Sequence, residues 1–271
     1  HVRSRRQRQM CIRDRINIDK NNRKVQVAVS GGMGSMGQLV TEFILNSDTY
    51  ELTGIYDPLN KSEIYKNFNN IEEIKADILF EFAPSDKVNL NLEKIDTSSL
   101  NLIVGSSGIQ ESTISQLQKN ASDERFICVI PNFSVGAALQ KIFSKILNDT
   151  FLDVRIEERH HSGKQDSPSG TAIDLAQSLT NSSKTSSIFS DSENAEINMV
   201  NNVNIKSLRG NKYLAEQIVY FQNKDEKFYM EHIVDDRSAY LNGIGYLLDL
   251  QGELKGFHYG LESIMSERFN I

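Results

Sequence analysis

A glycine-rich loop near the N-terminus constrains the fold of this chain more than any other feature. The sequence GMGSMG fits the pattern G-x-G-x-x-G at Gly32, Gly34 and Gly37. It follows an apolar run, residues 25–29, that predicts a buried strand, and it precedes residues 38–45, which predict a helix. Glycines there let the backbone approach a pyrophosphate, and the helix N-terminus offers it free N–H groups. The sequence therefore predicts a dinucleotide-binding α/β domain.

An aspartate supports this interpretation. Asp57 stands at the end of a second predicted strand, residues 51–57, where a carboxylate can accept hydrogen bonds from an adenosine ribose. The same carboxylate disfavours a 2′-phosphate. A glycine-rich turn without a ligand is the alternative interpretation. The order of strand, loop, helix and Asp57 favours the cofactor site.

Further apolar runs alternate with helical stretches in the first half of the chain. Strands are expected at residues 76–83, 101–108 and 126–134. Strands that alternate with helices imply crossover connections and a parallel sheet. The loops GSSG, residues 105–108, and IPNFS, residues 130–134, follow two of these strands. Either could be a simple turn, but their position favours a wall of a nicotinamide site.

The second half has a different order of elements, which predicts an α+β domain. We expect a helix at 135–147, a strand at 151–161, a helix at 171–179, a Ser/Asn-rich surface loop at 181–204, consecutive antiparallel strands at 204–210, 215–223 and 227–236, and a helix at 241–252 that returns to the first domain. The predicted architecture is α/β, a Rossmann-like dinucleotide-binding domain (residues 23–131 plus 238–271) with a second α+β domain (residues 132–237).

The first residues differ from the rest in charge. Residues 1–20 contain seven basic and two acidic side chains and show no apolar periodicity. The segment 1–22 could be a transit peptide, a basic arm that touches nucleic acid, or foreign sequence, and we favour foreign sequence that is disordered. Without residues 1–20 the formal net charge changes from −6 to −11, which argues against a nucleic-acid-binding core.

Composition narrows the protein class further. The chain has no run of about 18 apolar residues, the length that a membrane-spanning helix needs. Its two cysteines, Cys11 and Cys128, form no disulfide framework and suit a reducing cytosol. We interpret Cys128 as a core residue. A soluble cytoplasmic protein without a membrane or nucleic-acid partner is expected.

The stretch EERHHSGKQDSPSGTA, residues 157–172, concentrates chemically active side chains. Backbone N–H groups of Ser169, Gly170 and Thr171 precede a predicted helix and can bind a carboxylate. Lys164 adds a cation, and a neighbouring histidine can transfer a proton near neutral pH. Asp166 could cap or orient the loop. A solvated turn before a capped helix is the alternative to this anionic-substrate site.

Two other interpretations of the same stretch fail on its spacing. His160 and His161 are adjacent in a predicted strand, so their side chains point to opposite faces, and no further metal-ligand motif accompanies them. We therefore expect no metal. The phosphate-loop pattern G-x-x-x-x-G-K-[ST] is also not met, because Glu158 occupies the first glycine position.

This stretch resembles the signature of the 4-hydroxy-tetrahydrodipicolinate reductase (dihydrodipicolinate reductase) family, E-x-H-H-x-x-K-x-D-x-P-S-G-T-A. The resemblance extends to VAVSGGMGSMG, GSSG, PNFSVG, SLRG and NGIG, and so covers about residues 24–271. The matching residues of the signature are Glu158, His160, His161, Lys164, Asp166, Pro168, Ser169, Gly170, Thr171 and Ala172.

The resemblance implies a role for each matched position. His160 would donate or accept a proton, Lys164 would be a second proton donor, and His161, Gly170 and Thr171 would hold the substrate carboxylates. The cofactor would contact Gly31, Gly32, Met33, Gly34, Ser35, Met36, Asp57, Gly105, Ser106, Ser107, Ile130, Pro131, Asn132 and Phe133. The second domain would bind the substrate and form a homo-oligomer, typically a tetramer.

The implied activity is the NAD(P)H-dependent reduction of 4-hydroxy-tetrahydrodipicolinate in the diaminopimelate route of lysine biosynthesis. The chain departs from the family at three places: GSSG replaces GTTG, Pro58 replaces an arginine that grips a 2′-phosphate in some members, and Gln217 replaces a histidine found in several. The second departure favours NADH over NADPH, although Lys61 is close in sequence. The rival classes are another Rossmann-type nicotinamide dehydrogenase for a small carboxylated substrate and a non-catalytic nucleotide-sensing module.

Overall fold

The computed structural model describes residues 23–95, 100–179, 187, 189 and 195–270. The basic segment 1–22, with the interpretations given to it, lies outside these residues. The chain divides into two compact units, one ending at Ile127 and taking in Gly245–Phe257, the other formed by Cys128–Ile244 and the residues from His258 onward. The domain boundaries expected from the sequence stay a prediction.

A six-stranded sheet carries the glycine loop, and its strand order is β11-β5-β4-β3-β1-β2. The strands are β1 (Val25–Ser30), β2 (Tyr50–Tyr56), β3 (Ile78–Glu81), β4 (Asn101–Val104), β5 (Phe126–Val129) and β11 (Gly256–Tyr259). Strand β1 pairs in parallel with β2 and with β3, and β3 pairs in parallel with β4. The predicted Rossmann-like parallel sheet is confirmed. Sequence reasoning did not find β11.

Helices connect these strands, as crossover connections between parallel strands require. They are α2 (Ser35–Leu45), the short 3-10 helix Ile71–Glu73, α3 (Val88–Lys94) and α4 (Glu111–Asn120), while α7 (Leu241–Asp249) precedes β11. Helix α2 begins three residues earlier than expected, at the end of the glycine loop. The central strand β1 is buried on both faces, since Val27, Ala28 and Val29 are inaccessible to solvent.

A five-stranded sheet, β10-β9-β6-β8-β7, forms the second unit. Its strands are β6 (Asp153–His160), β7 (Glu196–Val200), β8 (Val203–Arg209), β9 (Ala215–Gln222) and β10 (Lys227–Val234). Two expectations are wrong here. Strand β6 lies between β8 and β9, and it pairs in parallel with β8. The three strands expected to be antiparallel neighbours, β8, β9 and β10, are therefore not all adjacent. The expected surface loop at 181–204 contains β7, which pairs with β8.

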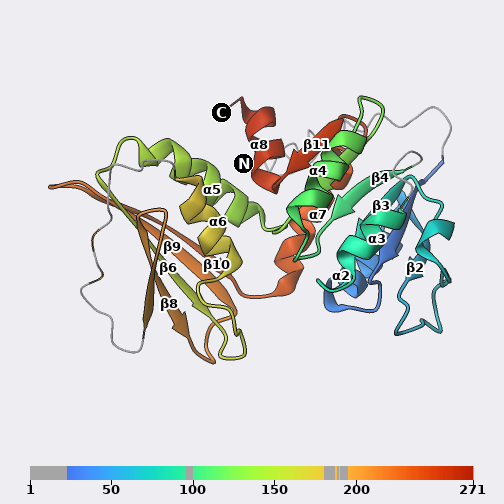
Figure 1. Ribbon diagram of the computed structural model, residues 1–271, viewed down its shortest axis with the longest axis horizontal. Coiled ribbons are helices and arrows are strands. Elements are labelled where there is room, and N and C mark those ends of the chain that lie inside the picture. Colours follow the sequence, from blue (N-terminus) through green and yellow to red (C-terminus); the bar gives the residue numbers. More distant parts are fainter. Residues whose placement is uncertain (1–22, 96–99, 180–186, 188, 190–194, 271) are drawn as a thin grey trace, which may run out of the picture. The chain divides into compact units, whose positions relative to one another are not determined.

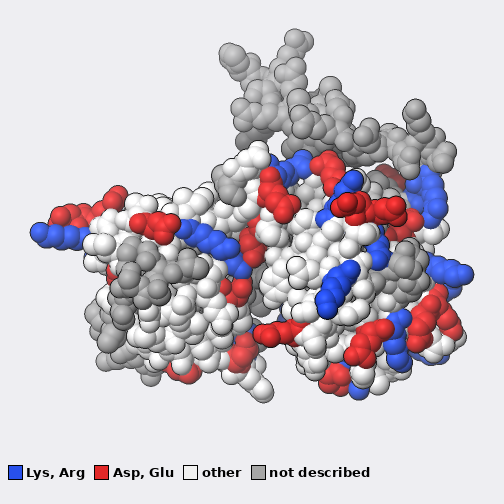
Figure 2. Space-filling view, turned by 45° about the horizontal axis from the view of Figure 1, so that its top comes forward, with Lys and Arg blue, Asp and Glu red and all other residues white. Residues whose placement is uncertain are grey.

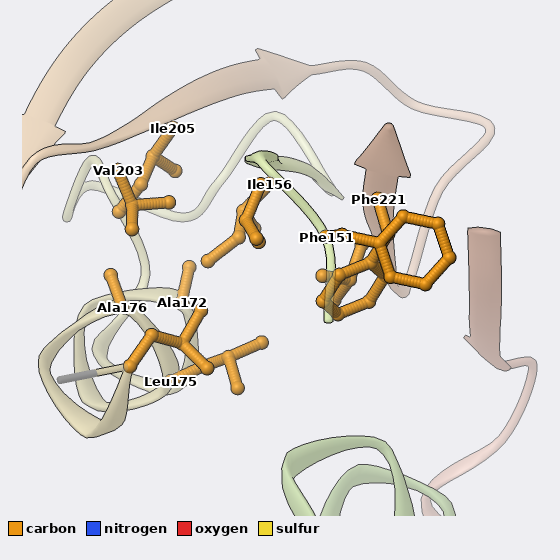
Figure 3. Close-up of a cluster of buried hydrophobic side chains, with 11 residues drawn as sticks. Phe151, Ile156, Ala172, Leu175, Ala176, Val203, Ile205 and Phe221 are labelled. Atoms are coloured by element: carbon orange, nitrogen blue, oxygen red, sulfur yellow. The ribbon is translucent and has the colours of Figure 1, made fainter. Parts of the chain in front are cut away.

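Helices α5 (Val135–Asn148) and α6 (Gly170–Ser178) cover one face of this sheet (Figure 1). Figure 3 shows Ala172, Leu175 and Ala176 of α6 packed against apolar side chains of the strands. Alternation along β6 and β8 supplies those side chains, among them Ile156 and Ile205, because every second residue of a strand faces the same side. This core fixes where α6 begins, and its first residues belong to the signature.

A largely buried lysine joins three helices of the second unit. Lys141 of α5 lies 2.6 Å from Asp174 of α6 and 2.6 Å from Glu262 of α8 (Leu261–Phe269). Burial favours the neutral amine, but hydrogen bonds to both carboxylates outweigh burial and raise the pKa of Lys141. The cation therefore holds the sheet-covering helices to the last helix.

Acidic and basic side chains are interspersed over the face seen in Figure 2, with uncharged surface between them. Among the described residues, no helix is long and apolar enough to cross a membrane.

Candidate active site

The glycine loop between β1 and α2 is shaped by its own packing. Gly31 has φ +71°, and a Cβ there would lie 2.7 Å from the carbonyl carbon of Phe82. A Cβ at Gly37 would lie 2.1 Å from the carbonyl oxygen of Gly31. Gly34 is different, because it is exposed and a Cβ would come no closer than 3.3 Å to a neighbouring atom. Internal packing thus requires Gly31 and Gly37, whereas Gly34 leaves backbone open for a ligand at the N-terminus of α2, which fits a pyrophosphate.

Asp57 contacts this loop directly. Its Oδ2 accepts a hydrogen bond from Met33 N at 3.3 Å, and its Oδ1 accepts from Leu59 N and Asn60 N at 3.2 and 2.9 Å. These bonds give Asp57 a structural task in the turn after β2. An ionised carboxylate has about four acceptor positions, so one remains for a ribose hydroxyl.

The GSSG loop after β4 is attached to β3. Gly105 N and Ser106 Oγ both donate to the carbonyl oxygen of Glu81, at 3.0 and 3.2 Å. Burial raises the pKa of the Glu81 carboxyl, which accepts a hydrogen bond from Ala83 N at 2.8 Å. The Ser106 hydroxyl is therefore engaged within the fold, whereas Ser107 is exposed and free to contact a ligand.

The loop 130–133 belongs to the second unit, unlike the other candidate cofactor residues. Ile130 and Phe133 have buried side chains, so only their backbone can face a ligand. Asn132 Nδ2 donates to Thr171 Oγ1 at 3.3 Å, and Asn132 Oδ1 accepts from Ser134 N at 2.9 Å. A residue expected to bind cofactor thus touches one expected to bind substrate.

His160 is the last residue of β6, and its side chain is 16% exposed. Its Nδ1 is hydrogen-bonded to Oε2 of Glu158, whose side chain is 0% exposed. Arg209 of β8, the register partner of His160, donates from Nη1 to Oε1 of Glu158 at 3.0 Å. Burial opposes ionisation of Glu158, but its hydrogen bonds, of which that from His160 contributes most, outweigh burial and hold its pKa below the usual value. The histidine thus ends a chain of ionisable groups whose central member, Glu158, is buried.

The loop after β6 presents Lys164. Lys164 N donates to the carbonyl oxygen of His161 at 3.1 Å, which forms a turn, and Lys164 Nζ lies 2.8 Å from Asp166 Oδ2. The hydrogen bond from Lys164 lowers the pKa of Asp166. Arg209 Nη2 donates to the backbone oxygen of Asp166 at 2.6 Å. Asp166 therefore orients the loop, as one of the two sequence-based interpretations expected.

The N-terminus of α6 follows. Ser169 is buried, and its Oγ caps the helix by accepting from Ala172 N at 3.3 Å. The first hydrogen bond of the helix runs from Ile173 N to Ser169 O, so the N–H groups of Gly170 and Thr171 have no acceptor within the helix. A Cβ at Gly170 would meet no atom within 4 Å. Open space and free N–H groups therefore coincide at Gly170, as an anion site requires.

Two residues of this site received no role from the sequence, Glu158 and Arg209. For Glu158 the sequence did carry a signal, because strand alternation places Glu158 and His160 on one face of β6. The arginine, however, comes from a strand whose pairing with β6 the sequence did not reveal.

Two other positions of interest lie in the core. Gln217, where several family members have a histidine, donates from Nε2 to Gln140 Oε1 at 2.9 Å, and Gln140 Nε2 donates back to the backbone oxygen of Gln217 at 3.0 Å. Cys128 is inaccessible to solvent, and burial raises the pKa of its thiol. The interpretation of Cys128 as a core residue is confirmed.

Comparison with known proteins decides the family. Residues 25–133 match the family described as "Dihydrodipicolinate reductase, N-terminus", and residues 134–265 match "Dihydrodipicolinate reductase, C-terminus". The chain belongs to the dihydrodipicolinate reductase family. A 4-hydroxy-tetrahydrodipicolinate reductase of Coxiella burnetii is 33% identical over 247 residues, covering 89% of this chain and 99% of the relative.

Solved structures support the same family. A dipicolinate-bound dihydrodipicolinate reductase from a Paenisporosarcina species has a TM-score of 0.76 at 25% identity, covering 89% of this chain and 100% of the other. Aspartate dehydrogenase from Thermotoga maritima shares only the fold, with a TM-score of 0.52 at 13% identity over 86% of this chain and 99% of the other. The expected family, fold class and oxidoreductase class are confirmed, and neither rival class has comparable support.

Proposed function

We propose that this family member reduces 4-hydroxy-tetrahydrodipicolinate to tetrahydrodipicolinate with NAD(P)H in the diaminopimelate route to lysine. The observation that carries the proposal is the segment between β6 and α6, where His160, Lys164 and the open helix N-terminus at Gly170 occur within a few residues. A planar dicarboxylate needs anion donors, and its reduction needs a proton. The relative from Paenisporosarcina was solved with dipicolinate, a ligand of that chemistry.

The chain's own residues have separate tasks in this reaction. A bound nicotinamide supplies the hydride. The N–H groups of Gly170 and Thr171, together with His161, hold the carboxylates and orient the ring. Lys164 leaves Asp166 to balance the charge of the dianion. The 4-hydroxyl group of the substrate leaves as water, which leaves a conjugated imine, and His160, at the end of β6, gives a proton to the ring as the hydride adds.

A coupled assay tests the function. Substrate is formed in the cuvette from pyruvate and aspartate semialdehyde by a separate synthase, and NADH oxidation is followed by absorbance. We expect oxidation only when all components are present. No oxidation with either NADH or NADPH would reject the proposed function.

Gly170→Ala separates binding from folding. The methyl group meets open space in the free protein, so we expect unchanged or slightly raised stability, because alanine is favoured over glycine in helices by about 0.5–1 kcal/mol. The methyl group would instead collide with a bound carboxylate and raise KM for the substrate. Thermal unfolding and steady-state kinetics check both parts. An unchanged KM would remove Gly170 from the proposed site.

We further propose that NADH is used at least as well as NADPH. Asp57 would repel a 2′-phosphate, and Pro58 provides no compensating cation. Lys61, the cation close in sequence, instead contacts Asn69, since its Nζ donates to Asn69 Oδ1 at 3.4 Å. The values of kcat/KM measured side by side for the two cofactors provide the test, and Pro58→Arg is expected to improve NADPH use. A tenfold preference for NADPH would contradict the role of Asp57.

The second sheet supports a proposed homo-oligomer, a tetramer in line with the family resemblance. On the face that α5 and α6 leave uncovered, Tyr229 is 65% exposed and Ile233 is 48% exposed. Ion pairs of Arg159 with Glu157 and Glu216 lie on the same face. A cytoplasmic location is also proposed, in keeping with the free thiol of Cys128.

A further inference from the structure

We propose that Glu158 and Arg209 form a positioning pair that keeps the proton of neutral His160 on Nδ1 and reserves Nε2 for the substrate. The inference rests on the proposed function, since it explains how His160 performs the proton transfer assigned to it there. Neither residue touches substrate in this account. They act through the imidazole and through the loop that carries Lys164.

The geometry of β6 and β8 supports the first part. Glu158 and His160 are two residues apart on one strand, so both side chains lie on the same face. Oε2 of Glu158 meets Nδ1 of His160, and Oε1 meets Arg209. An ionised carboxylate only accepts hydrogen bonds, so Nδ1 must be the donor. Neutral His160 then has its lone pair on Nε2, the nitrogen free to exchange a proton with a ligand.

The charges around His160 support a proton transfer from Nε2 to the substrate. Glu158 and Arg209 cancel while His160 is neutral, and protonation of Nε2 adds a charge that the buried carboxylate stabilises at short range. When the imidazolium gives its Nε2 proton to the substrate, it returns to the Nδ1–H form and Glu158 stays ionised. Among the described residues, charged groups near this chain include Lys164 and Asp166 on the loop and the exposed Glu196 on β7. On the β9 side the register partner of His160 is Ala215, which is uncharged.

Arg209 extends the same arrangement to the lysine. Its Nη1 binds Glu158, while its Nη2 binds the backbone oxygen of Asp166 at 2.6 Å. Asp166 in turn holds Lys164 at 2.8 Å. One guanidinium therefore links both candidate proton donors through two of its nitrogens.

The kinetic test is Glu158→Gln, which keeps the size of the side chain and removes its charge. We expect kcat to fall at least about tenfold while KM for the substrate changes little, since a charge-free partner no longer holds the imidazole in one tautomer and one orientation. NADH affinity should stay unchanged. Glu158→Asp, which retains the carboxylate, should recover part of the kcat that Glu158→Gln loses.

Glu157→Gln is the matched control. Glu157 is also a buried, ion-paired carboxylate on β6, but it lies on the opposite face and binds Arg159 and Lys206. Its variant should lose stability and keep a kcat near that of the wild type. If Glu158 has a purely structural role, Glu158→Gln and Glu158→Asp should both behave like this control. That result would overturn the proposal.

A spectroscopic test needs no activity. Nitrogen-15 spectra of histidine-labelled protein, with His160 assigned from a His160→Gln sample, report which ring nitrogen is protonated. We expect the Nδ1–H tautomer for neutral His160 in the wild type. An Nε2–H tautomer there would overturn the proposal even if Glu158→Gln failed to fold. Wild-type inactivity in the coupled assay would reject the proposed function but leave this measurement valid.

Discussion

His160→Gln is expected to lower kcat by about 10²–10⁴-fold, the usual contribution of a general acid. Glutamine can occupy the space and donate a hydrogen bond, but it cannot give up a proton. NADH affinity should stay near that of the wild type, because the glycine loop and Asp57 belong to the other compact unit. Steady-state kinetics and an NADH titration on the folded variant provide the measurement.

His258→Gln is the control for this prediction. His258 is also largely buried, and its Nδ1 lies 3.9 Å from Glu267, but it is not part of the candidate site. Its variant should retain kcat. If His160→Gln retains a wild-type kcat as well, the assignment of His160 as proton donor is wrong, whatever the family membership of the chain.

Lys164→Ala is expected to damage both turnover and substrate binding. The ammonium would face a dianion in the ground state and in the transition state, so KM should rise and kcat should fall. A charge-assisted hydrogen bond contributes about 1.5–3 kcal/mol, which corresponds to a rise in KM of about tenfold or more. Kinetics at varied substrate and fixed saturating NADH separate the two effects.

Lys224→Ala provides the comparison, since Lys224 is an exposed lysine between β9 and β10. It should leave kcat and KM unchanged. Loss of thermal stability in Lys164→Ala with normal kinetics would indicate that Lys164 only secures the loop through Asp166.

Strands β1 to β5 of the six-stranded sheet could be predicted from the sequence because they are short, largely apolar and separated by helical stretches, whereas β11 was not found. The order of the second sheet could not be. Residues 203–209 pair with β6, far away in the sequence, and no local pattern encodes that choice. Strand β7 was hidden in a Ser/Asn-rich stretch. Helix α8 was overlooked although Leu261, Ile264 and Met265 show helical spacing and are buried.

The candidate site was predictable only where its residues are close in the sequence. His160, Lys164 and Gly170 lie on one segment, and the resemblance named them together. Arg209 was matched only as part of the short motif SLRG, because its place beside Glu158 and His160 depends on the pairing of β8 with β6. Asn132 was expected at the cofactor, and its contact with Thr171 follows from packing between a loop and a helix that are 39 residues apart.

The buried ammonium of Lys141 has a consequence for where this protein tolerates shortening. Deleting the last helix would remove Glu262 and leave the cation with Asp174 alone. A largely buried charge that loses one of two partners destabilises the fold, so the contact between α5 and α6 would weaken. Because α6 opens at Gly170, a truncation at the carboxyl terminus would loosen the anion site through the body of that helix.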